Sequence, residues 1–266
     1  MTTEDSSAVP DYPARLRLDG RSYVVVGAGV GMGRQTAHAL AQAGAAGIVC
    51  VDVDEARAGE IAEEIGVGVA WCGDVTRRAE VARLAADAEA VLGRIDGFVD
   101  IVGMARWAAL LDIDDETFDW ELDICLRHAY LCSQELGRRM VASGGGTMVF
   151  IASVSGLTAA PMHAAYGAAK AALMAWVQSI AVELGPSGVR ANAVAPGTIL
   201  TPRMDAVFTA DQRAANSGNA PLRRMGATAD VAAAALFLTS DLSAYVTGRT
   251  IVVDGGVDAK FPYGTL

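Results

Sequence analysis

The stretch VVVGAGVGMGRQTAHALAQAG (Val24–Gly44) decides the fold of this chain. Its first three residues form a β-branched apolar run that is typical of a buried strand, and residues 32–43 have a helical pattern. The turn that joins them contains four glycines, at Gly27, Gly29, Gly31 and Gly33. We therefore expect a strand, a glycine-rich turn and a helix in succession.

The spacing of these glycines indicates a nucleotide site. Glycine lets the backbone turn tightly and approach a pyrophosphate, which then lies at the N-terminus of the following helix. The common GxGxxG pattern fails because Met32 occupies the position of its third glycine, whereas GxxxGxG fits through Gly27, Gly31 and Gly33. A glycine-rich turn alone is weak evidence, since glycine is also an ordinary turn residue.

Strand-like and helical segments alternate along the rest of the chain. Apolar runs predict seven strands, within residues 22–29, 47–54, 68–75, 95–103, 146–153, 189–197 and 249–256. Helical patterns predict helices at Met32–Ala43, Glu55–Ile65, Arg78–Leu92, within Asp115–Ala142, at Tyr166–Leu184 and at Ala229–Leu238. Continuous valine and isoleucine runs are typical of a parallel sheet that helices cover on both faces. We predict a single doubly wound α/β domain of the Rossmann type at residues 17–266, with a seven-stranded parallel sheet, behind a flexible tail at residues 1–16.

Composition limits the partners of such a domain. The chain has 266 residues, 52% of them hydrophobic, and a formal net charge of -10, which argues against nucleic acid as a partner. No apolar run reaches the ~18–20 residues that a bilayer crossing needs. The acidic, polar start MTTEDSSAVPDYPARL does not fit a signal peptide, so we expect a cytoplasmic protein without membrane contact.

The cysteines do not indicate a metal site. They stand at Cys50, Cys72, Cys125 and Cys132, with no CxxC pair and no metal-ligand clustering. We interpret them as buried, reduced thiols and expect no bound metal.

Carboxylates follow two of the predicted strands. Asp52 ends the second strand, and an acid about 20 residues beyond the glycine turn is placed to accept hydrogen bonds from a ribose and to repel a 2'-phosphate. Val30 offers no basic group for that phosphate, so we predict NAD rather than NADP; a helix cap or turn residue is the alternative for Asp52. Asp74 is a candidate for the adenine amino group, with the Val75 backbone framing the ring, or is a solvated turn residue.

The segment HAAYGAAKAALMAW (His163–Trp176) places one phenol and one amine on a helix. Tyr166 and Lys170 are four residues apart, which puts them on the same helix face. The pair alone is compatible with a tyrosine packed on a lysine stem. It is also compatible with proton transfer, because a free tyrosine has a pKa of ~10 and a nearby cation favours the phenolate. On this fragment alone, the packing interpretation is the simpler one.

Taken together, these motifs resemble the short-chain dehydrogenase/reductase family in its compact form. GxxxGxG, Tyr-x-x-x-Lys and a serine thirteen residues before the tyrosine, Ser153, have the family's joint spacing. NAVAPGTILTPRM (Asn192–Met204) and VVDGG (Val252–Gly256) are similar to its later segments, so the resemblance covers Arg21 to Gly256.

The resemblance implies an NAD-dependent oxidoreductase in which Tyr166 is the acid or base. Lys170 would supply the positive charge and hold the nicotinamide ribose, and Ser153 would hydrogen-bond the substrate oxygen. The implied cofactor-binding residues are Gly27, Gly29, Gly31, Met32, Gly33, Asp52, Val53, Asp74, Val75, Ile101, Gly103, Tyr166, Lys170, Pro196, Gly197, Ile199 and Thr201. The family's usual assembly implies a homotetramer, in which a second subunit covers the outer face of the Tyr166–Leu184 helix. The terminal segment DAKFPYGTL would expose Phe261 and Tyr263 unless it packs on a neighbour.

The sequence departs from the family pattern in three places. Val26 stands where threonine is usual, and DIVG (Asp100–Gly103) replaces Asn-Asn-Ala-Gly. Cys125 aligns with the helical asparagine that, by resemblance, completes a tetrad and positions a relay water. A thiol hydrogen-bonds more weakly than an amide. The sequence therefore predicts an intact triad of Ser153, Tyr166 and Lys170. It does not support the proton relay through a water held by the helical asparagine.

The substrate side is predicted as a lid at about residues 199–220 over an apolar pocket. The predicted pocket residues are Met104, Trp107, Leu157, Met162, His163, Met204 and Phe208. This lining favours a hydrophobic secondary alcohol or ketone, cyclic ones included. The alternatives are an NAD-binding protein with weak or no catalysis, because of Cys125 and DIVG, and a flavin- or methyl-donor-binding Rossmann protein, which leaves the Tyr–Lys pair unexplained.

Overall fold

The computed structural model describes residues 8–260 and is built around a seven-stranded parallel sheet. The strands are β1 (Ser22–Val26), β2 (Gly47–Asp52), β3 (Gly68–Cys72), β4 (Gly97–Asp100), β5 (Gly146–Ile151), β6 (Val189–Pro196) and β9 (Thr250–Val253). Their order is β3-β2-β1-β4-β5-β6-β9, and every neighbouring pair is parallel. The predicted α/β fold is confirmed.

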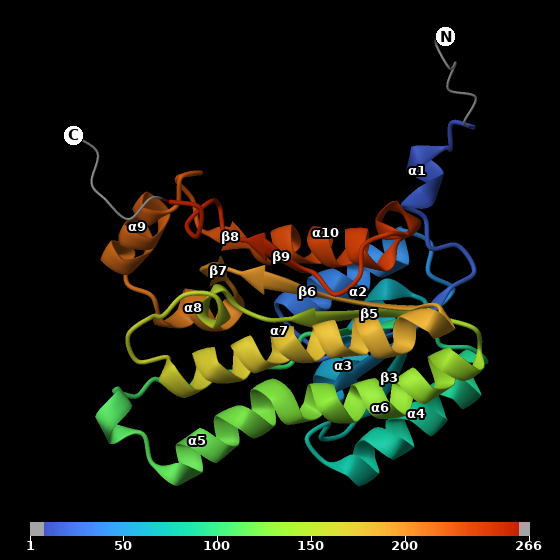
Figure 1. The fold of residues 1–266 in the computed structure, drawn as a ribbon, viewed down its shortest axis with the longest axis horizontal. Helices are drawn as coiled ribbons and strands as arrows, with labels where there is room; N and C mark the ends of the chain where they lie inside the picture. The colour runs from blue at the N-terminus through green and yellow to red at the C-terminus, as the bar shows by residue number, and fades with distance from the viewer. Residues whose placement is uncertain (1–7, 261–266) are drawn as a thin grey trace.

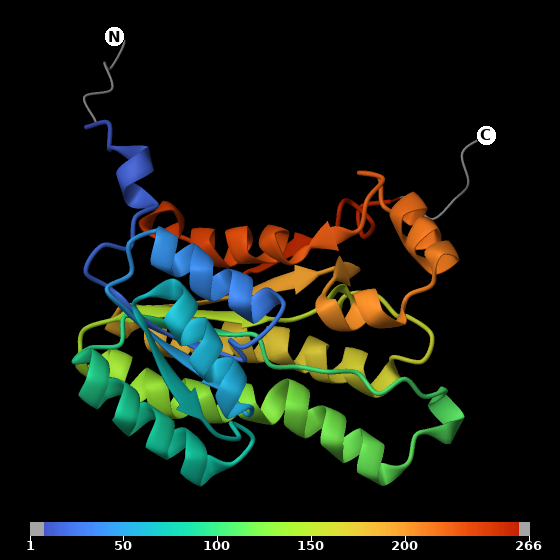
Figure 2. The same ribbon diagram turned by 180° about the vertical axis from the view of Figure 1, so that it is seen from behind.

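Helices cover both faces of this sheet (Figures 1 and 2). One face carries α4 (Arg78–Leu92), α6 (His128–Ala142) and α7 (Ala164–Leu184), and the other carries α2 (Met32–Gln42), α3 (Glu55–Ile65) and α10 (Thr228–Thr239). The shorter helices are α1 (Tyr12–Arg15), α5 (Asp115–Leu122), the π-helical segment η2 (Asp123–Arg127), α8 (Pro202–Val207) and α9 (Ala210–Asn219). Single 3-10 turns are η1 (Leu110–Asp112), η3 (Val154–Gly156), η4 (Gly185–Ser187) and η5 (Asp241–Ser243).

The first strand shows how the sequence builds two cores. All five residues of β1 are buried, and successive side chains point to opposite faces of the sheet. Val24 and Val26 pack in the core beneath α4, α6 and α7, whereas Tyr23 and Val25 pack in the core beneath α2 and α10. The continuous apolar run is therefore required because both faces are covered.

The strand order reverses between β1 and β4. The chain runs outward from β1 through β2 to β3 and then returns to the other side of β1, so the order reverses between β1 and β4. Ligands of doubly wound sheets bind outside the carboxyl ends of the strands at this reversal. In Figure 1 the arrowheads of β6 and β9 point to the side on which α8 and α9 lie. Residues 199–220, predicted as a lid, thus lie at the carboxyl edge of the sheet, and their role as a lid stays a prediction.

Most predicted elements lie where the sequence placed them. The helices at Glu55–Ile65 and Arg78–Leu92 match α3 and α4 residue for residue, and α7 begins two residues before the predicted start at Tyr166. The sequence missed a two-stranded parallel sheet of β7 (Ile199–Leu200) and β8 (Gly226–Ala227), because two-residue strands carry no period. It also missed the π-helical segment within the long helix.

Two further expectations concern the ends of the chain and the thiols. Residues 1–7 and 261–266, with Phe261 and Tyr263, lie outside the described residues, and residues 12–15 of the predicted tail form the exposed helix α1. The expectation of buried thiols is wrong for Cys72, which is exposed on edge strand β3, and holds for Cys50, Cys125 and Cys132. In the part of the chain that the structure describes, no helix has the length and apolar character for a membrane crossing.

Candidate active site

The glycine turn is shaped so that only hydrogen fits at several positions. Gly27 and Gly31 have φ values of 82° and 61°, a backbone conformation that favours glycine. A Cβ on Gly33 would overlap the carbonyl oxygen of Gly27, so α2 packs directly on the turn. Gly31 caps α2 without any side-chain cap hydrogen bond. This cradle fits a pyrophosphate, because it leaves backbone N–H groups at a helix N-terminus facing an open turn.

The segment after β6 closes the far side of this cradle. A Cβ on Gly31 would lie 3.6 Å from Pro202 Cδ and 3.8 Å from Thr201 Cβ. Thr201 caps α8 by accepting a hydrogen bond from the Met204 amide. The glycine turn and Thr201, 170 positions apart in the chain (201 minus 31), therefore face each other across the predicted pyrophosphate path.

Asp52 lies against the same turn. Its Oδ2 atom accepts a hydrogen bond from the Gly29 amide at 3.0 Å, and its Oδ1 atom accepts one from the Asp54 amide at 3.0 Å. The carboxylate therefore organises the turn and retains lone pairs for a ribose. Asp54, rather than Asp52, caps α3.

A basic residue that the sequence reasoning missed stands beside this carboxylate. A Cβ on Gly29 would lie 2.6 Å from Arg57 Cβ, so Arg57 begins directly over the glycine turn. Its Nε atom lies 3.4 Å from Asp54 Oδ2. Its signal in the sequence was its place in the first turn of the helix after Asp52.

Other predicted cofactor residues have partners within the chain. Asp74 accepts hydrogen bonds from the Thr76 amide at 2.9 Å and the Thr76 hydroxyl at 2.7 Å, which is a local turn role. Val75 is buried, whereas Val53 is exposed. An adenine contact by Asp74 stays a prediction.

The predicted catalytic residues converge at the carboxyl end of β5. Lys170 is 2% exposed, and its Nζ atom donates a hydrogen bond to the Ile151 carbonyl oxygen at 2.7 Å. The same Nζ atom lies 5.9 Å from the centre of the Tyr166 ring. Ser153 follows β5, and its hydroxyl oxygen accepts a hydrogen bond from the Ser155 amide at 3.1 Å. The buried Lys170 amine thus contacts the end of the strand and lies one helical turn from the phenol.

Two glycines allow the serine turn to approach α7. A Cβ on Gly156 would lie 2.7 Å from the Ala171 amide nitrogen, and a Cβ on Gly167 would lie 2.6 Å from the Ser155 carbonyl oxygen. Neither position has room for a side chain. The turn that carries Ser153 is therefore seated directly on the helix that carries Tyr166.

Gly103 and Cys125 complete the surroundings of Lys170. A Cβ on Gly103 would lie 2.6 Å from Lys170 Nζ and 3.8 Å from Cys125 Sγ. The Cys125 thiol lies in η2 and donates to the Met104 carbonyl oxygen at 3.3 Å. Burial raises the pKa of this thiol, although the Lys170 charge opposes the rise. The thiol is therefore a protonated donor at neutral pH.

The structure brings some predicted pocket residues together. The Trp107 and His163 rings are 6.2 Å apart, and the His163 and Tyr166 rings are 5.9 Å apart. Met162 has a φ of 63°, and its carbonyl oxygen accepts a hydrogen bond from the Ala108 amide. Leu157 follows η3, whereas Met204 lies on α8 and Phe208 directly after it, both within the predicted lid segment. Leu157, Met204 and Phe208 are not part of the ring contacts that join Trp107, His163 and Tyr166.

Sequence reasoning missed two buried ionisable residues near this site. Glu121 accepts a hydrogen bond from the Arg106 amide at 2.6 Å, and His128 lies 3.1 Å from the Asp100 carboxylate. The signal was a polar residue at both ends of the segment around Cys125, four positions before it and three after it.

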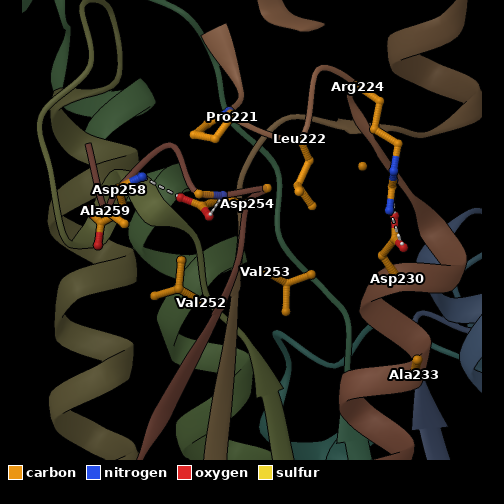
Figure 3. Close-up of a pocket in the computed structure, with 13 residues that line it drawn as sticks. Pro221, Leu222, Arg224, Asp230, Ala233, Val252, Val253, Asp254, Asp258 and Ala259 are labelled. Atoms are coloured by element: carbon orange, nitrogen blue, oxygen red, sulfur yellow. Dashed lines mark hydrogen bonds and ion pairs between the residues drawn. The ribbon is translucent and has the colours of Figure 1, made fainter. Parts of the chain in front are cut away.

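A cavity of about 700 Å³ lies elsewhere, beside the end of β9. Figure 3 shows Leu222, Val252 and Val253 around it, with Arg224 and Asp230 paired at one side. Its lining includes none of the predicted catalytic or substrate-pocket residues. No group of three or more metal-ligating side chains occurs within residues 8–260.

Comparison with known proteins assigns the chain to a family. A family model described as enoyl-(acyl carrier protein) reductase matches residues 27–258, from the glycine turn to beyond β9. The chain belongs to the short-chain dehydrogenase/reductase family. As a short-chain dehydrogenase/reductase it is an oxidoreductase that uses a nicotinamide cofactor, and the resemblance inferred from its motifs is confirmed.

Relatives of this short-chain dehydrogenase/reductase act on different substrates. It is 35% identical to L-rhamnose 1-dehydrogenase (NAD(P)(+)) of Azotobacter vinelandii, over 91% of this chain and 98% of the relative. It is also 35% identical to galactitol 2-dehydrogenase (L-tagatose-forming) of Cereibacter sphaeroides, over 92% and 98%. A solved 7α-hydroxysteroid dehydrogenase, complexed with NADH and 7-oxo glycochenodeoxycholic acid, superposes with a TM-score of 0.88 at 31% identity, over 91% and 96%.

Proposed function

We propose that this enzyme transfers a hydride between NAD(H) and a hydrophobic secondary alcohol or ketone, with Tyr166 as the acid or base. The observation that carries the proposal is the buried Lys170 cation, held by the Ile151 carbonyl one helical turn from Tyr166. Burying a lysine is costly unless its charge is used or compensated. A phenolate at Tyr166 would compensate it.

Each side chain then has a distinct task. Tyr166 takes the proton of the substrate hydroxyl during oxidation and returns it during reduction. Lys170 favours the anionic form of Tyr166, and its remaining N–H groups are available to ribose hydroxyls. Ser153 accepts from the Ser155 amide, so its own hydroxyl proton is free to stabilise the substrate oxygen. The bound nicotinamide ring supplies the hydride acceptor or donor.

We propose NAD as the preferred cofactor. The Asp52 carboxylate is fixed by two backbone amides beside the glycine turn, where a 2'-phosphate would meet its charge. Arg57 is the opposing feature, since its positive charge lies nearby, but it is paired with Asp54. Steady-state rates with NAD and NADP at matched concentrations test this proposal.

The apolar surroundings support a hydrophobic substrate. Met104, Trp107, Leu157 and Met162 are each between 42% and 54% exposed, so they present apolar surface, and the His163 ring links Trp107 to Tyr166. A bulky cyclic ketone would bury this surface. The hydroxysteroid dehydrogenase among the similar structures accords with this choice.

A polyol or sugar is the second candidate substrate. Rhamnose and galactitol dehydrogenases are among the relatives at 35% identity. A purified-enzyme panel of cyclic alcohols, steroids, sugars and polyols with NAD, read by NADH absorbance, separates the two. Turnover of polyols with no turnover of apolar alcohols would replace the first candidate.

The remaining alternative is a nucleotide-binding protein with little or no catalysis. It is motivated by Cys125 and by the DIVG segment, and retention of Ser153, Tyr166 and Lys170 argues against it. Mass spectrometry of the nucleotide that copurifies also separates NAD from a flavin or a methyl donor. A tightly bound NAD(H) without turnover across the panel would favour this alternative.

We propose a cytoplasmic homotetramer. The outer edge of β9 has no strand partner within residues 8–260, and the cavity of Figure 3 lies beside it. Val182, on the outer face of α7, is 76% exposed. Light scattering coupled to size-exclusion chromatography gives the mass; a monomer across concentrations would contradict the proposal.

A further inference from the structure

Residues 101–109, which follow β4, have no regular secondary structure of their own. This segment carries Ile101 and Gly103, which are predicted to line the cofactor, and Trp107, which is predicted to line the substrate pocket. A loop at such a place needs external contacts to keep one conformation, because its backbone groups have no ladder or helix to join.

Those contacts come from one face of the rod that α5, η2 and α6 form. Glu121, Cys125 and His128 are spaced by four and three residues, so they project from one side of the rod. Glu121 accepts from the Arg106 amide at 2.6 Å, and Cys125 donates to the Met104 carbonyl at 3.3 Å. Both bonds hold the loop backbone rather than its side chains.

The third contact is a buried pair of ionisable side chains. His128 Nε2 lies 3.1 Å from Asp100 Oδ2, and both side chains are 1% exposed. Asp100 Oδ1 accepts from the Val102 amide at 3.1 Å, so the carboxylate joins the helix to the first turn of the loop. Within the described residues, His128 Nδ1 has no hydrogen-bond partner, and Asp100 Oδ2 has none beyond its approach to His128. Each group therefore depends on the other.

We propose that Asp100 and His128 form a positioning pair, and that with Glu121 and Cys125 they hold residues 100–106 so that Gly103 stays against Lys170. We call these four side chains the loop clamp. The proposal rests on the proposed function for its catalytic consequence, because Lys170 acts on Tyr166. The positioning of the loop by the clamp does not depend on that function, because it is inferred from the contacts alone.

The burial of Asp100 and His128 indicates that the pair does more than fill space in the core. A buried charge without a partner is costly, and apolar residues of similar volume commonly replace buried pairs without loss of stability. Retaining two ionisable groups at 1% exposure therefore gains a defined geometry rather than stability. That geometry is the placement of the Val102 amide and, one residue later, of Gly103.

The test combines a disruptive variant, a conservative one and a matched control. His128→Leu removes the partner of Asp100, and His128→Gln restores an N–H donor near the same position. Leu136→Ala, on the same helix and fully buried, lowers stability without a contact to the clamp. Amide hydrogen exchange over residues 101–106 reports the loop directly, and NADH titration with kcat reports its consequence.

We expect His128→Leu to raise exchange over residues 101–106 by about tenfold and to lower kcat by about 10–100-fold. His128→Gln should bring the loop exchange and kcat back toward the wild-type values. Leu136→Ala should lower the melting temperature and leave the loop exchange and kcat unchanged. If His128→Leu does not fold, Asp100→Asn replaces it, because the asparagine removes the carboxylate and keeps the shape. We expect the same changes in loop exchange and kcat, but smaller ones.

Unchanged loop exchange in a folded His128→Leu or Asp100→Asn would overturn the clamp. So would a rise in exchange that Leu136→Ala reproduces, since the effect would then follow stability alone. If the variant shows faster loop exchange but the wild type turns over no substrate, the exchange result supports the clamp. The missing turnover then counts against the proposed function only.

Discussion

Lys170 fills the space that a side chain at position 103 would need. The Nζ atom of Lys170 lies 2.6 Å from the point where a Cβ on Gly103 would stand. This relationship explains why glycine remains in DIVG although both asparagines of the family pattern are absent. The loop after β4 and the lysine of α7 are fitted to each other, so a change in one displaces the other.

Replacing Gly103 with alanine tests this fit. The added methyl group would push Lys170 Nζ away from the Ile151 carbonyl, and we expect Gly103→Ala to lower kcat by about 10–100-fold. Gly59→Ala is the control, because a Cβ at position 59 meets nothing within 4 Å and alanine favours helix α3 by about 1 kcal/mol. Equal kcat values in wild type and Gly103→Ala would mean that the contact does not position Lys170.

Asp52→Ala tests cofactor choice. The substitution removes the negative charge beside the glycine turn and the hydrogen bonds to the Gly29 and Asp54 amides. We expect kcat/KM for NAD to fall by about tenfold and the preference for NAD over NADP to narrow. Asp114→Ala, which removes the aspartate cap of α5, should lower stability by about 1 kcal/mol and leave the preference in place. A wild type that uses both cofactors equally would contradict the assignment.

Cys125→Ser tests whether the thiol acts as a hydrogen-bond donor. A serine hydroxyl still reaches toward the Met104 carbonyl, so we expect turnover within about twofold of the wild type. Cys125→Asn should raise turnover modestly if the relay predicted by resemblance is otherwise intact. Loss of activity in a folded Cys125→Ser with unchanged NADH affinity would reveal a role of the thiol itself.

Thiol labelling tests the burial of the cysteine side chains. The thiolate is the reactive form, and burial raises the pKa of Cys50 to about 12 and raises the pKa values of Cys125 and Cys132. Cys72 is exposed. In native protein at pH about 8, iodoacetamide should label Cys72 alone, and the other three should react only after unfolding; peptide mass spectrometry gives the sites. Rapid labelling of Cys125 would contradict its placement.

The sequence predicts much of this fold because the determining patterns are local. Apolar runs such as Val24–Val26 and the helical periods of residues 55–65 and 78–92 are visible without tertiary information. The short strands β7 and β8 pair only because residues 199–200 and 226–227 meet in space. Their residues have no local pattern that separates them from a loop.

The candidate site is predictable where a motif fixes it and hidden where packing fixes it. The spacing of Tyr166, Lys170 and Ser153 identified the group that converges on β5. The pairing of Asp100 with His128 joins residues 28 positions apart (128 minus 100) and depends on how α6 packs against β4. The π-helical turn at Cys125 likewise has no signal in a single sequence.

The most direct test of the account is Tyr166→Phe, which deletes the transferable proton at almost constant shape. NADH affinity is measured by fluorescence titration, and turnover by NADH absorbance with a ketone or alcohol that the panel identifies. The account predicts an NADH dissociation constant within about threefold of the wild type and a kcat lowered by at least about 100-fold. A folded Tyr166→Phe enzyme that turns over at the wild-type rate would contradict it.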